Sequence, residues 1–331
     1  MKTLFPSVPV LMCCLLALPL HAQSANPVAL YAAARPYTDE SLPQLKAHVH
    51  ELSGIKPDIN QADLPGLLAS VSEVIMAQMP RVPNLIAHEE IALEVLPPPT
   101  PSGGYYSGGS GIGGSGRNRA QSVSVTPVPT TQDVHLIQQP WRRFDYIILS
   151  EHLPDGSVLF NESRKSLERT NARSSTPVPP RGTGFASSWF IFLPFNLVES
   201  HFRFLGTQNV GHQQTYVVAF AQDPAAVKFP GVIEMPSGPV PLLYQGIAWI
   251  DQQTSRIVRL RSDLLAPQHQ VRLTEVTSTV EFTEAKIPNL ESALWLPRNV
   301  EITWNIDGQR SGELHRYSNY GLFHATSRIV D

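Results

Sequence analysis

The side chains of this chain that could do chemistry are mostly acids and histidines, and their spacing matches no known reaction site. Asp145, Asp251 and Glu281 are the acids to check for a glycosidase, which needs two carboxylates about 5–10 Å apart in a cleft. Asp251 is better explained as a turn residue that bonds its own backbone. Glu281 is better explained as a solvent-facing partner of Arg259 and Arg261 across a sheet. We therefore predict no catalytic residue and no enzyme.

The histidines do not form a metal-binding pattern. His88-Glu89-Glu90 lacks the second histidine of a zinc protease helix. His48 and His50 are two residues apart on a predicted helix, so they face different directions. Others are scattered: His201, His212, His269, His315 and His324. Scattered histidines are usually surface residues or hydrogen-bonded core residues, so we expect no metal and no cofactor.

The glycine-rich tract matches known motifs by letters alone. Gly111-x-Gly113-x-x-Gly116 has the spacing of a dinucleotide-binding loop, but it follows no strand and opens no helix. Neither Ser110 nor Ser115 completes the Gly-x-Ser-x-Gly turn of a hydrolase. We read the tract as low-complexity sequence without a nucleotide or a nucleophile.

The first 22 residues have the pattern of a secretory signal. Lys2 begins it, an apolar run follows over 8–20, and Leu20-His21-Ala22 is an acceptable cleavage site. Cys13 and Cys14 lie inside that run, so the exported chain would have no cysteine for a disulfide, a zinc–thiolate site or a nucleophile. We expect an exported protein in the periplasm or cell envelope of a bacterium, with no transmembrane segment after signal cleavage. The alternative is that the signal is retained as an anchor.

The charge of the chain gives no reason to expect a nucleic-acid partner. Its 331 residues are 42% hydrophobic and 16% charged, with a formal net charge of −3. A negative protein is not attracted to nucleic acid or to an anionic membrane surface.

Hydrophobic periodicity predicts an α+β fold. Apolar residues recur at helical spacing from Asp63 to Met79, and Glu40 to Leu52 is a shorter helix candidate. From residue 85 onward about nine strands follow, mostly joined by short turns. The clearest hairpin is Pro241 to Leu264, in which Val258 and Leu260 are expected on one face of the strand. Gln214 to Gln222 is apolar on both faces and is expected at the centre of the sheet.

The expected architecture is a strongly curved antiparallel sheet, a half-barrel meander with the amphipathic helices packed on its concave face. We divide the chain into the signal at 1–22, N-terminal helices and a first strand at 23–96, a disordered Pro/Gly/Ser-rich insertion at 97–131, and the remaining sheet at 132–331. The alternative for 97–131 is a linker between two domains. We favour the insertion because the segment before it is too small to hold its own core.

One aromatic stretch, Ser187 to Val198, has no strand alternation. We predict a short helical turn, broken before Pro194, that plugs the concave face of the sheet. The functional alternative is a lid over an apolar cavity, or a contact with a lipid or protein partner.

Several short motifs in the chain are structural. They are VPN at 82–84 after the amphipathic helix, WRRFD at 141–145, YQGIAWID at 244–251, IVRL at 257–260 and LP at 296–297. With these motifs the chain resembles a family of uncharacterised exported bacterial proteins, which is itself similar to the lipoprotein-carrier (LolA/LolB-like) superfamily, over roughly Trp141 to Ile329. The resemblance implies a half-barrel with helices in its mouth that holds acyl chains on its concave face. It carries over no catalytic residue.

The predicted function is an exported binding module that holds a hydrophobic ligand, a lipid or an acyl chain, on the concave face. The alternative is an envelope structural or protein-interaction protein with the same fold and no cargo. An exported hydrolase is the third reading, and it would need a polar cluster in a cleft. The candidate ligand-lining residues are Phe144, Tyr146, Phe160, Trp189, Phe192, Phe202, Phe204, Tyr216, Phe220, Trp249, Val280 and Trp304.

Overall fold

The structure is a computed structural model of the chain that describes residues 27–95, 137–138, 140–153, 158–167, 182, 184–228, 230–233 and 240–323. The predicted signal at 1–22 and the predicted insertion at 97–131 lie outside the described residues.

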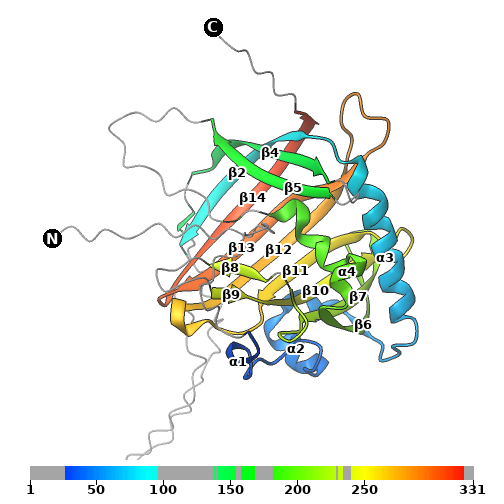
Figure 1. The fold of residues 1–331 in the computed structure, drawn as a ribbon, viewed down its shortest axis with the longest axis vertical. Helices are drawn as coiled ribbons and strands as arrows, with labels where there is room; N and C mark the ends of the chain where they lie inside the picture. Colours follow the sequence, from blue (N-terminus) through cyan, green and yellow to red (C-terminus); the bar gives the residue numbers. More distant parts are fainter. Residues whose placement is uncertain are drawn as a thin grey trace, which may run out of the picture.

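An open antiparallel sheet of twelve strands forms the body of the molecule (Figure 1). Its order is β1-β6-β7-β10-β11-β12-β13-β14-β2-β4-β5, with β3 paired to β2, and β8 and β9 form a separate two-stranded sheet. The strands are β1 Lys56–Pro57, β2 Leu85–Val95, β3 Ile137–Gln138, β4 Arg142–His152, β5 Val158–Ser166, β6 Ser200–Val210, β7 Gln213–Gln222, β8 Gly231–Ile233, β9 Val240–Leu242, β10 Tyr244–Asp251, β11 Ile257–Leu264, β12 Leu273–Ala285, β13 Leu294–Ile306 and β14 Gln309–Leu322.

Short helices accompany the sheet. They are α1 Pro27–Leu30, α2 Leu42–His48, η1 His50–Gly54, α3 Leu64–Gln78, η2 Met79–Arg81, η3 Phe185–Phe192, α4 Pro194–Leu197 and η4 His269–Val271, where η denotes a 3-10 helix. Within the ranges given above, none of the helices has both the length and the apolar character needed to cross a membrane.

The strand count and order go beyond the predicted meander of about nine strands. Four strands, β1, β3, β8 and β9, have only two or three residues and are too short for a period of two to reveal. From β6 to β14 the main-sheet strands do follow chain order, apart from the β8–β9 excursion. The sheet then continues with β2, which precedes all of them in the chain and lies between β14 and β4.

The central strands are buried on both faces of the sheet. On β7, Val218 and Phe220 belong to the largest apolar cluster of the protein, whereas Val217 and Ala219 belong to a second one. Because successive side chains of a strand point to opposite faces, the two clusters lie on opposite sides of the sheet. We call the side of the largest cluster the inner face and the other the outer face. The prediction that 214–222 forms a central, two-sided strand is confirmed.

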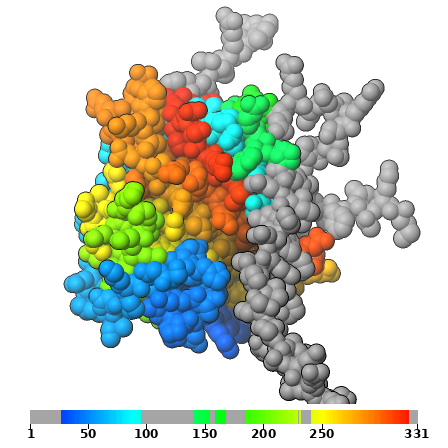
Figure 2. Space-filling model, turned by 180° about the vertical axis from the view of Figure 1, so that it is seen from behind, coloured from blue at the N-terminus to red at the C-terminus, as the bar shows by residue number. Residues whose placement is uncertain are grey.

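The two predicted amphipathic helices lie on opposite faces, which corrects the expectation that both pack on one. Val71 and Ile75 of α3 are buried in the inner cluster, whereas Leu45 of α2 and Leu52 of η1 are buried in the outer one. The physical reason is that β7, β10 and β11 carry apolar side chains on both faces of the sheet, so each face needs helices packed against it. The rear view shows the N-terminal segment over this outer face, in blue (Figure 2).

An ion pair fastens the N-terminal segment to the outer face. Arg261 on β11 contacts both carboxylate oxygens of Glu51 in η1, at 3.0 and 3.1 Å from Nη1. The same guanidinium donates to Asp263 at 2.8 and 2.9 Å. Two parallel hydrogen bonds from one guanidinium hold a carboxylate in a defined orientation.

A β-bulge changes the predicted alternation of β11. Trp249 pairs with Arg259 and Ile250 with Ile257, so Val258 is an extra residue on its strand. Val258 therefore lies in the outer cluster and Leu260 in the inner one, rather than on one face as predicted.

Candidate functional site

A helical layer made of α3, η3 and α4 lies in front of the inner face, and we call it the cover (Figure 1). Gly184, which directly precedes η3, has a φ of 84°, a conformation that favours glycine. Leu193 turns to extended backbone before Pro194, which begins α4, so the stretch is a short helical turn broken before Pro194, as predicted. The side chains of Phe185, Trp189 and Phe192 are buried beneath it.

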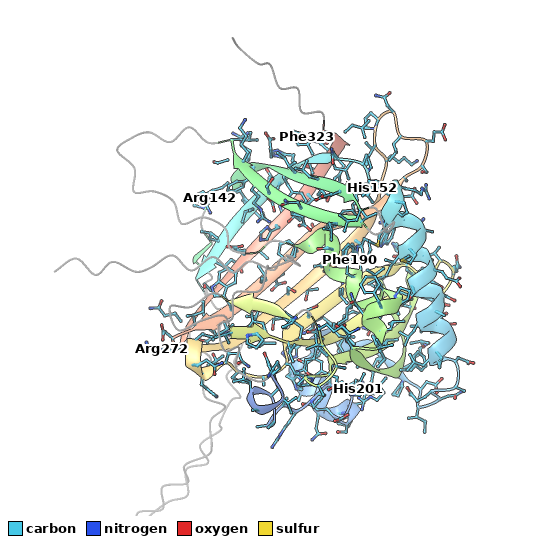
Figure 3. The ribbon with its side chains drawn as sticks, in the orientation of Figure 1. Arg142, His152, Phe190, His201, Arg272 and Phe323 are labelled. Atoms are coloured by element: carbon cyan, nitrogen blue, oxygen red, sulfur yellow. The ribbon has the colours of Figure 1, made fainter. Side chains whose placement is uncertain are left out.

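Aromatic rings fill the contact between the cover and the sheet. The Phe192 ring lies 5.5 Å from Phe202 on β6 and 6.0 Å from Phe220 on β7. The Trp189 ring meets Phe160 of β5 edge to face at 6.3 Å. Such offset and edge-on pairs are favourable, but they are not as directional as hydrogen bonds. Phe190, labelled in Figure 3, lies on the cover in front of the sheet, with its ring 5.5 Å from Phe160.

Two side chains of α3 hold the cover in place. The Ser72 hydroxyl donates to the carbonyl oxygen of Phe192, so α3 and η3 are joined within the cover. The amide of Gln78 bonds the backbone of Trp295 on β13 twice, donating to its carbonyl at 2.8 Å and accepting from its N–H at 3.0 Å. The second contact ties the C-terminal end of α3 to the sheet.

A small cavity remains where α3, η3, the β10–β11 turn and β13 meet. Its volume is about 20 Å³, which is room for about one water molecule. The lining residues are Val74, Ile75, Gln78, Trp189, Ser255, Arg256, Ile257 and Trp295. We call it the indole cavity because two tryptophan rings form part of its wall.

A group of buried and partly buried charged residues lies on the inner face beyond the N-terminal end of η3. We call it the polar cluster, and its members are Glu89, Glu162, Arg164, Glu313 and His315. Glu89, Glu313 and His315 are exposed by 0%, 1% and 1%. Arg164 donates two hydrogen bonds to the carboxylate of Glu89, from Nε at 2.5 Å and from Nη2 at 2.8 Å.

The His315 ring lies between two of these carboxylates. Its Nδ1 is 2.9 Å from Glu89 Oε1, and its Nε2 is 3.1 Å from Glu313 Oε2. A hydrogen bond at each ring nitrogen requires one proton more than a neutral imidazole and two carboxylates carry. With that proton and the guanidinium of Arg164, the charges of Glu89 and Glu313 are balanced, as buried charges must be.

The polar cluster also binds the backbone that leads into the cover. Gly182 donates its N–H to Glu313 at 3.1 Å and its carbonyl accepts from Arg164. Gly184 donates its N–H to Glu162 at 2.9 Å, and Tyr146 donates its hydroxyl to the same carboxylate oxygen. The backbone that precedes η3 is therefore held by charged groups, whereas η3 itself packs on the sheet through apolar contacts.

These surroundings shift the pKa values of the cluster carboxyls in opposite directions. Burial raises the pKa of Glu89, but the hydrogen bond from His315 and the charge of Arg164 outweigh it, so the pKa falls to about 2. For Glu162 burial outweighs the hydrogen bond from Tyr146 and the charge of Arg164, so its pKa is raised. Burial is also the largest cause of the raised pKa values of Tyr146 and Tyr317, which line the cluster.

Most of the predicted ligand-lining residues come together on the inner face. Buried in the inner cluster are Tyr146, Trp189, Phe192, Phe220, Val280 and Trp304, and partly buried against it are Phe160, Phe202, Phe204 and Tyr216. Phe144 is buried on β4 outside this cluster, with Arg142 over its ring at 5.5 Å. Trp249 lies in the outer cluster, where its indole N–H donates to Gln208. Their positions do not test whether these residues contact a ligand, so that role stays a prediction.

Two of the three acids considered for catalysis have hydrogen-bonded structural partners. Asp251 accepts from the backbone N–H groups of Gln253 and Thr254 at 3.1 and 2.8 Å, which confirms its turn role. Glu281 accepts from Arg259 at 2.7 Å across β11 and β12, as predicted, whereas Arg261, the other expected partner, contacts Glu51 and Asp263 instead. Asp145 lies opposite His88 and Lys165 in the sheet.

Sequence reasoning missed the polar cluster. In the sequence, Glu89 belongs only to a histidine–acid motif, and His315 is one of the scattered histidines. The sequence does contain one signal for it. Glu89 lies two residues from Ala87 and two from Ile91 on β2, so its side chain points to the same face of the strand as these two buried residues. A charged residue in the buried phase of a strand needs a charged partner, although alternation alone does not say from which strand the partner comes.

Comparison with known proteins gives structural matches alone, because no family model and no curated protein sequence matches this chain. The structure is similar to a DUF1329 family protein from Desulfovibrio piger, with 12% identity, 80% of this chain and 94% of that chain covered, and a TM-score of 0.36. A second match is NE2245, a LolA superfamily protein from Nitrosomonas europaea, which belongs to the superfamily that the sequence resembles. It is 11% identical, with 79% of this chain and 94% of that chain covered and a TM-score of 0.29.

A further match is a putative outer membrane lipoprotein-sorting protein domain from Vibrio parahaemolyticus. It is 10% identical, with 76% of this chain and 90% of that chain covered and a TM-score of 0.35.

Proposed function

We propose that this chain is a non-enzymatic binding module of the bacterial cell envelope, which holds a lipid or acyl chain between the inner face and the cover. The observation that carries the proposal is the way in which the cover is attached. Trp189, Phe192 and Leu193 are buried against the sheet, and the rings they meet belong to β5, β6 and β7.

Apolar contacts of this kind can be exchanged for contacts with a ligand. The hydrophobic effect is non-directional and contributes about 25 cal/mol per Å² of buried apolar surface, whichever molecule supplies that surface. The strands of the sheet beneath are joined by ladder hydrogen bonds. An acyl chain that lies on the inner face can therefore replace the apolar side chains of the cover at little net change in free energy.

The attachment points define how the cover would move. The polar cluster holds the backbone at Gly182 and Gly184, and Gln78 holds the C-terminal end of α3 to Trp295. Ser72 joins α3 to η3, so the two helices would move together. The indole cavity, at about 20 Å³, is too small for an acyl chain, so entry requires the cover to leave the sheet.

The absence of an enzymatic role is part of the proposal. A catalytic group must reach a substrate, and Glu89, Glu313 and His315 have at most 1% exposure and are bonded to one another or to the cover. Their geometry serves to hold backbone in place.

Native mass spectrometry with lipid extraction, on protein purified gently from a bacterial periplasm, tests the proposal. A co-purified lipid, or uptake of added fatty acid or phospholipid, supports it. A bare protein mass without any uptake contradicts it. If that result came with a stable protein complex in pull-downs, the chain would be an envelope interaction protein without cargo.

A pair of glutamine variants tests the route of entry. Gln78→Ala removes two hydrogen bonds between α3 and β13, which lowers the cost of opening by about 1–2 kcal/mol and raises the open population roughly tenfold. Uptake should become faster to a similar extent. Gln208→Ala is the matched control, because this amide also makes two hydrogen bonds, to Glu51 and Trp249, on the outer face. Equal uptake rates in the two variants would contradict entry beneath the cover.

A further inference from the structure

The cover carries almost no charge. Its three elements, α3, η3 and α4, have 15, 8 and 4 residues, and Glu73 on α3 is the only charged residue among them. This share is well below the 16% of charged residues in the whole chain. The next acid along the chain, Glu199, is only 7% exposed and accepts from the backbone N–H of Lys228 at 3.3 Å. The composition of the cover therefore differs from that of a layer whose outer side meets water alone.

Large apolar side chains project from the same layer. Phe195 on α4 is 59% exposed and Val198, directly after α4, is 72% exposed, while Met76 on α3 is 48% exposed. Phe195 and Val198 are three residues apart on one helical turn, so they lie on the same side of it. We call these two residues the apolar pair. Single exposed apolar residues are common, but a phenylalanine and a valine together on an uncharged layer form a site for contact with another apolar surface.

Buried neighbours and hydrogen bonds hold the apolar pair in its exposed position. Phe192 and Leu193, just before α4, have 0% exposure. The side-chain amide of Asn196 donates to the carbonyl of Phe190 at 2.8 Å, and the N–H groups of Asn196 and Leu197 donate to the carbonyl of Leu193 at 2.9 Å. Turning the apolar pair inward would break these bonds and expose side chains that are now buried. The exposure is therefore part of the fold.

The size and charge of this surface fit neutral lipid better than a protein partner. A stable protein interface buries about 800 Å² on each side. Phe195, Val198 and Met76 together expose roughly 350 Å² or less, taking about 200 Å² for each fully exposed side chain. A lipid surface requires less area, because apolar side chains need only enter the boundary between head groups and acyl chains. The cover has no lysine or arginine, so anionic lipids would add no attraction.

We propose that the cover docks on the surface of a lipid bilayer, with Phe195 and Val198 inserted at the boundary between the head groups and acyl chains of electrically neutral lipids. This interaction goes beyond the proposed function, because the cover can meet a lipid surface whether or not an acyl chain lies beneath it. Burial of apolar surface supplies the binding, so the interaction needs no basic residue and salt does not screen it.

Cosedimentation of the purified full chain with vesicles tests the docking. The protein should bind vesicles of neutral phosphatidylcholine, and replacing part of this lipid by anionic phosphatidylglycerol should not strengthen the binding. Added salt should change the partition coefficient by less than about twofold. Phe195→Ser and Val198→Ser should each lower the partition coefficient about tenfold, because each removes apolar area that leaves water on docking. Both side chains are more than half exposed, so these variants should keep the thermal stability of the parent protein.

Leu149 on β4 offers a matched control. Its side chain is also apolar and exposed, by 38%. It alternates with Ile148 of the inner cluster, so it lies on the outer face, away from the cover. Leu149→Ser should leave vesicle binding unchanged. A direct readout comes from Phe195→Trp and Leu149→Trp: brominated phosphatidylcholine should quench the fluorescence of the added indole in the first variant and not in the second.

Three results would overturn the inference: no sedimentation with phosphatidylcholine vesicles, sedimentation with anionic vesicles alone, or serine variants that bind as the parent does. Equal quenching in the two tryptophan variants would also contradict it. If the protein instead formed a dimer that Phe195→Ser abolishes, without binding vesicles, the apolar pair would be a contact between two copies of the chain. The proposed function is measured separately, by uptake of added fatty acid without vesicles, which the serine variants should retain.

Discussion

Arg164 and Glu89 form a two-point ion pair on the inner face, in which the arginine side chain is 9% exposed and the glutamate side chain is fully buried. Burial of a charged pair is costly in itself, and it is tolerated here because His315, Glu313 and the backbone of Gly182 complete the network. Loss of one partner would leave the other as an unpaired buried charge.

Glu89→Gln should therefore destabilise the protein by about 3–5 kcal/mol, as expected when one member of a buried ion pair is removed. The double variant Glu89→Met with Arg164→Met, which replaces both charges by apolar side chains, should recover a large part of that loss. The free energy of unfolding from urea titration measures both. If the double variant is as unstable as Glu89→Gln alone, the pair is not the source of the effect.

Acid should weaken the fold through Glu89. Because the pKa of this carboxyl falls from 4.5 to about 2 in the folded chain, its stabilising contribution is present above pH 4.5 and is lost as the pH falls through about 2. The size of the contribution is about 3 kcal/mol from a shift of this magnitude. Urea unfolding between pH 6 and pH 2 gives the slope, and Glu89→Gln should flatten it.

Glu162 should show the opposite sign. Its pKa is raised in the folded chain, so it contributes stability below its ordinary pKa and loses that contribution as the pH rises through the raised value. In Glu162→Gln the free energy of unfolding should rise relative to the parent protein as the pH increases toward neutrality. A parallel pH profile for variant and parent would contradict this.

Two glycine variants test the packing of the central hairpin against a matched helix position. A methyl group on Gly246 of β10 would lie 1.9 Å from the carbonyl oxygen of Arg261 and 2.7 Å from the Phe220 ring. Gly246→Ala should therefore destabilise the protein by about 3 kcal/mol or more. Gly66→Ala in α3 meets nothing within 4 Å and should stabilise the protein by about 0.5–1 kcal/mol. Thermal unfolding of both variants checks the contrast.

Loss of Arg261 should free the N-terminal segment without disturbing the inner face. Arg261→Met keeps an apolar stem but removes the contacts to Glu51 and Asp263. Amide hydrogen exchange should accelerate in α2 and η1, while α3 and η3 keep their protection. Equal loss of protection in both regions would mean that the two faces do not unfold separately.

Local patterns were enough to find the long strands and the long helix of this fold, because these are local properties, whereas strands of two or three residues were too short to show a period. The period of two placed the long strands, and Pro194 marked the break in the aromatic stretch. The face of the sheet to which each strand residue points was harder to predict. A bulge between Trp249 and Ile250 moves Val258 to the outer side, and no composition signal marks it. The pairing of β2 with β14 depends on contacts between distant parts of the chain.

The candidate site was predictable in its apolar part alone. Aromatic residues such as Phe192, Phe202 and Phe220 could be assigned to one surface, since apolar side chains must be buried somewhere. Glu89 and His315 are 226 positions apart, and their contact exists only once β2 and β14 are neighbours.

The place of β2 in the sheet has a consequence for how this protein is made. Leu85–Val95 is synthesised early, yet one of its two neighbours is β14, Gln309–Leu322, near the end of the chain. Until β14 emerges, one edge of β2 has no ladder partner, and the contact between Glu89 and His315 cannot form. Pairing over so many residues is slow, and an unpaired edge invites aggregation. The complete sheet therefore cannot form until β14 has been synthesised.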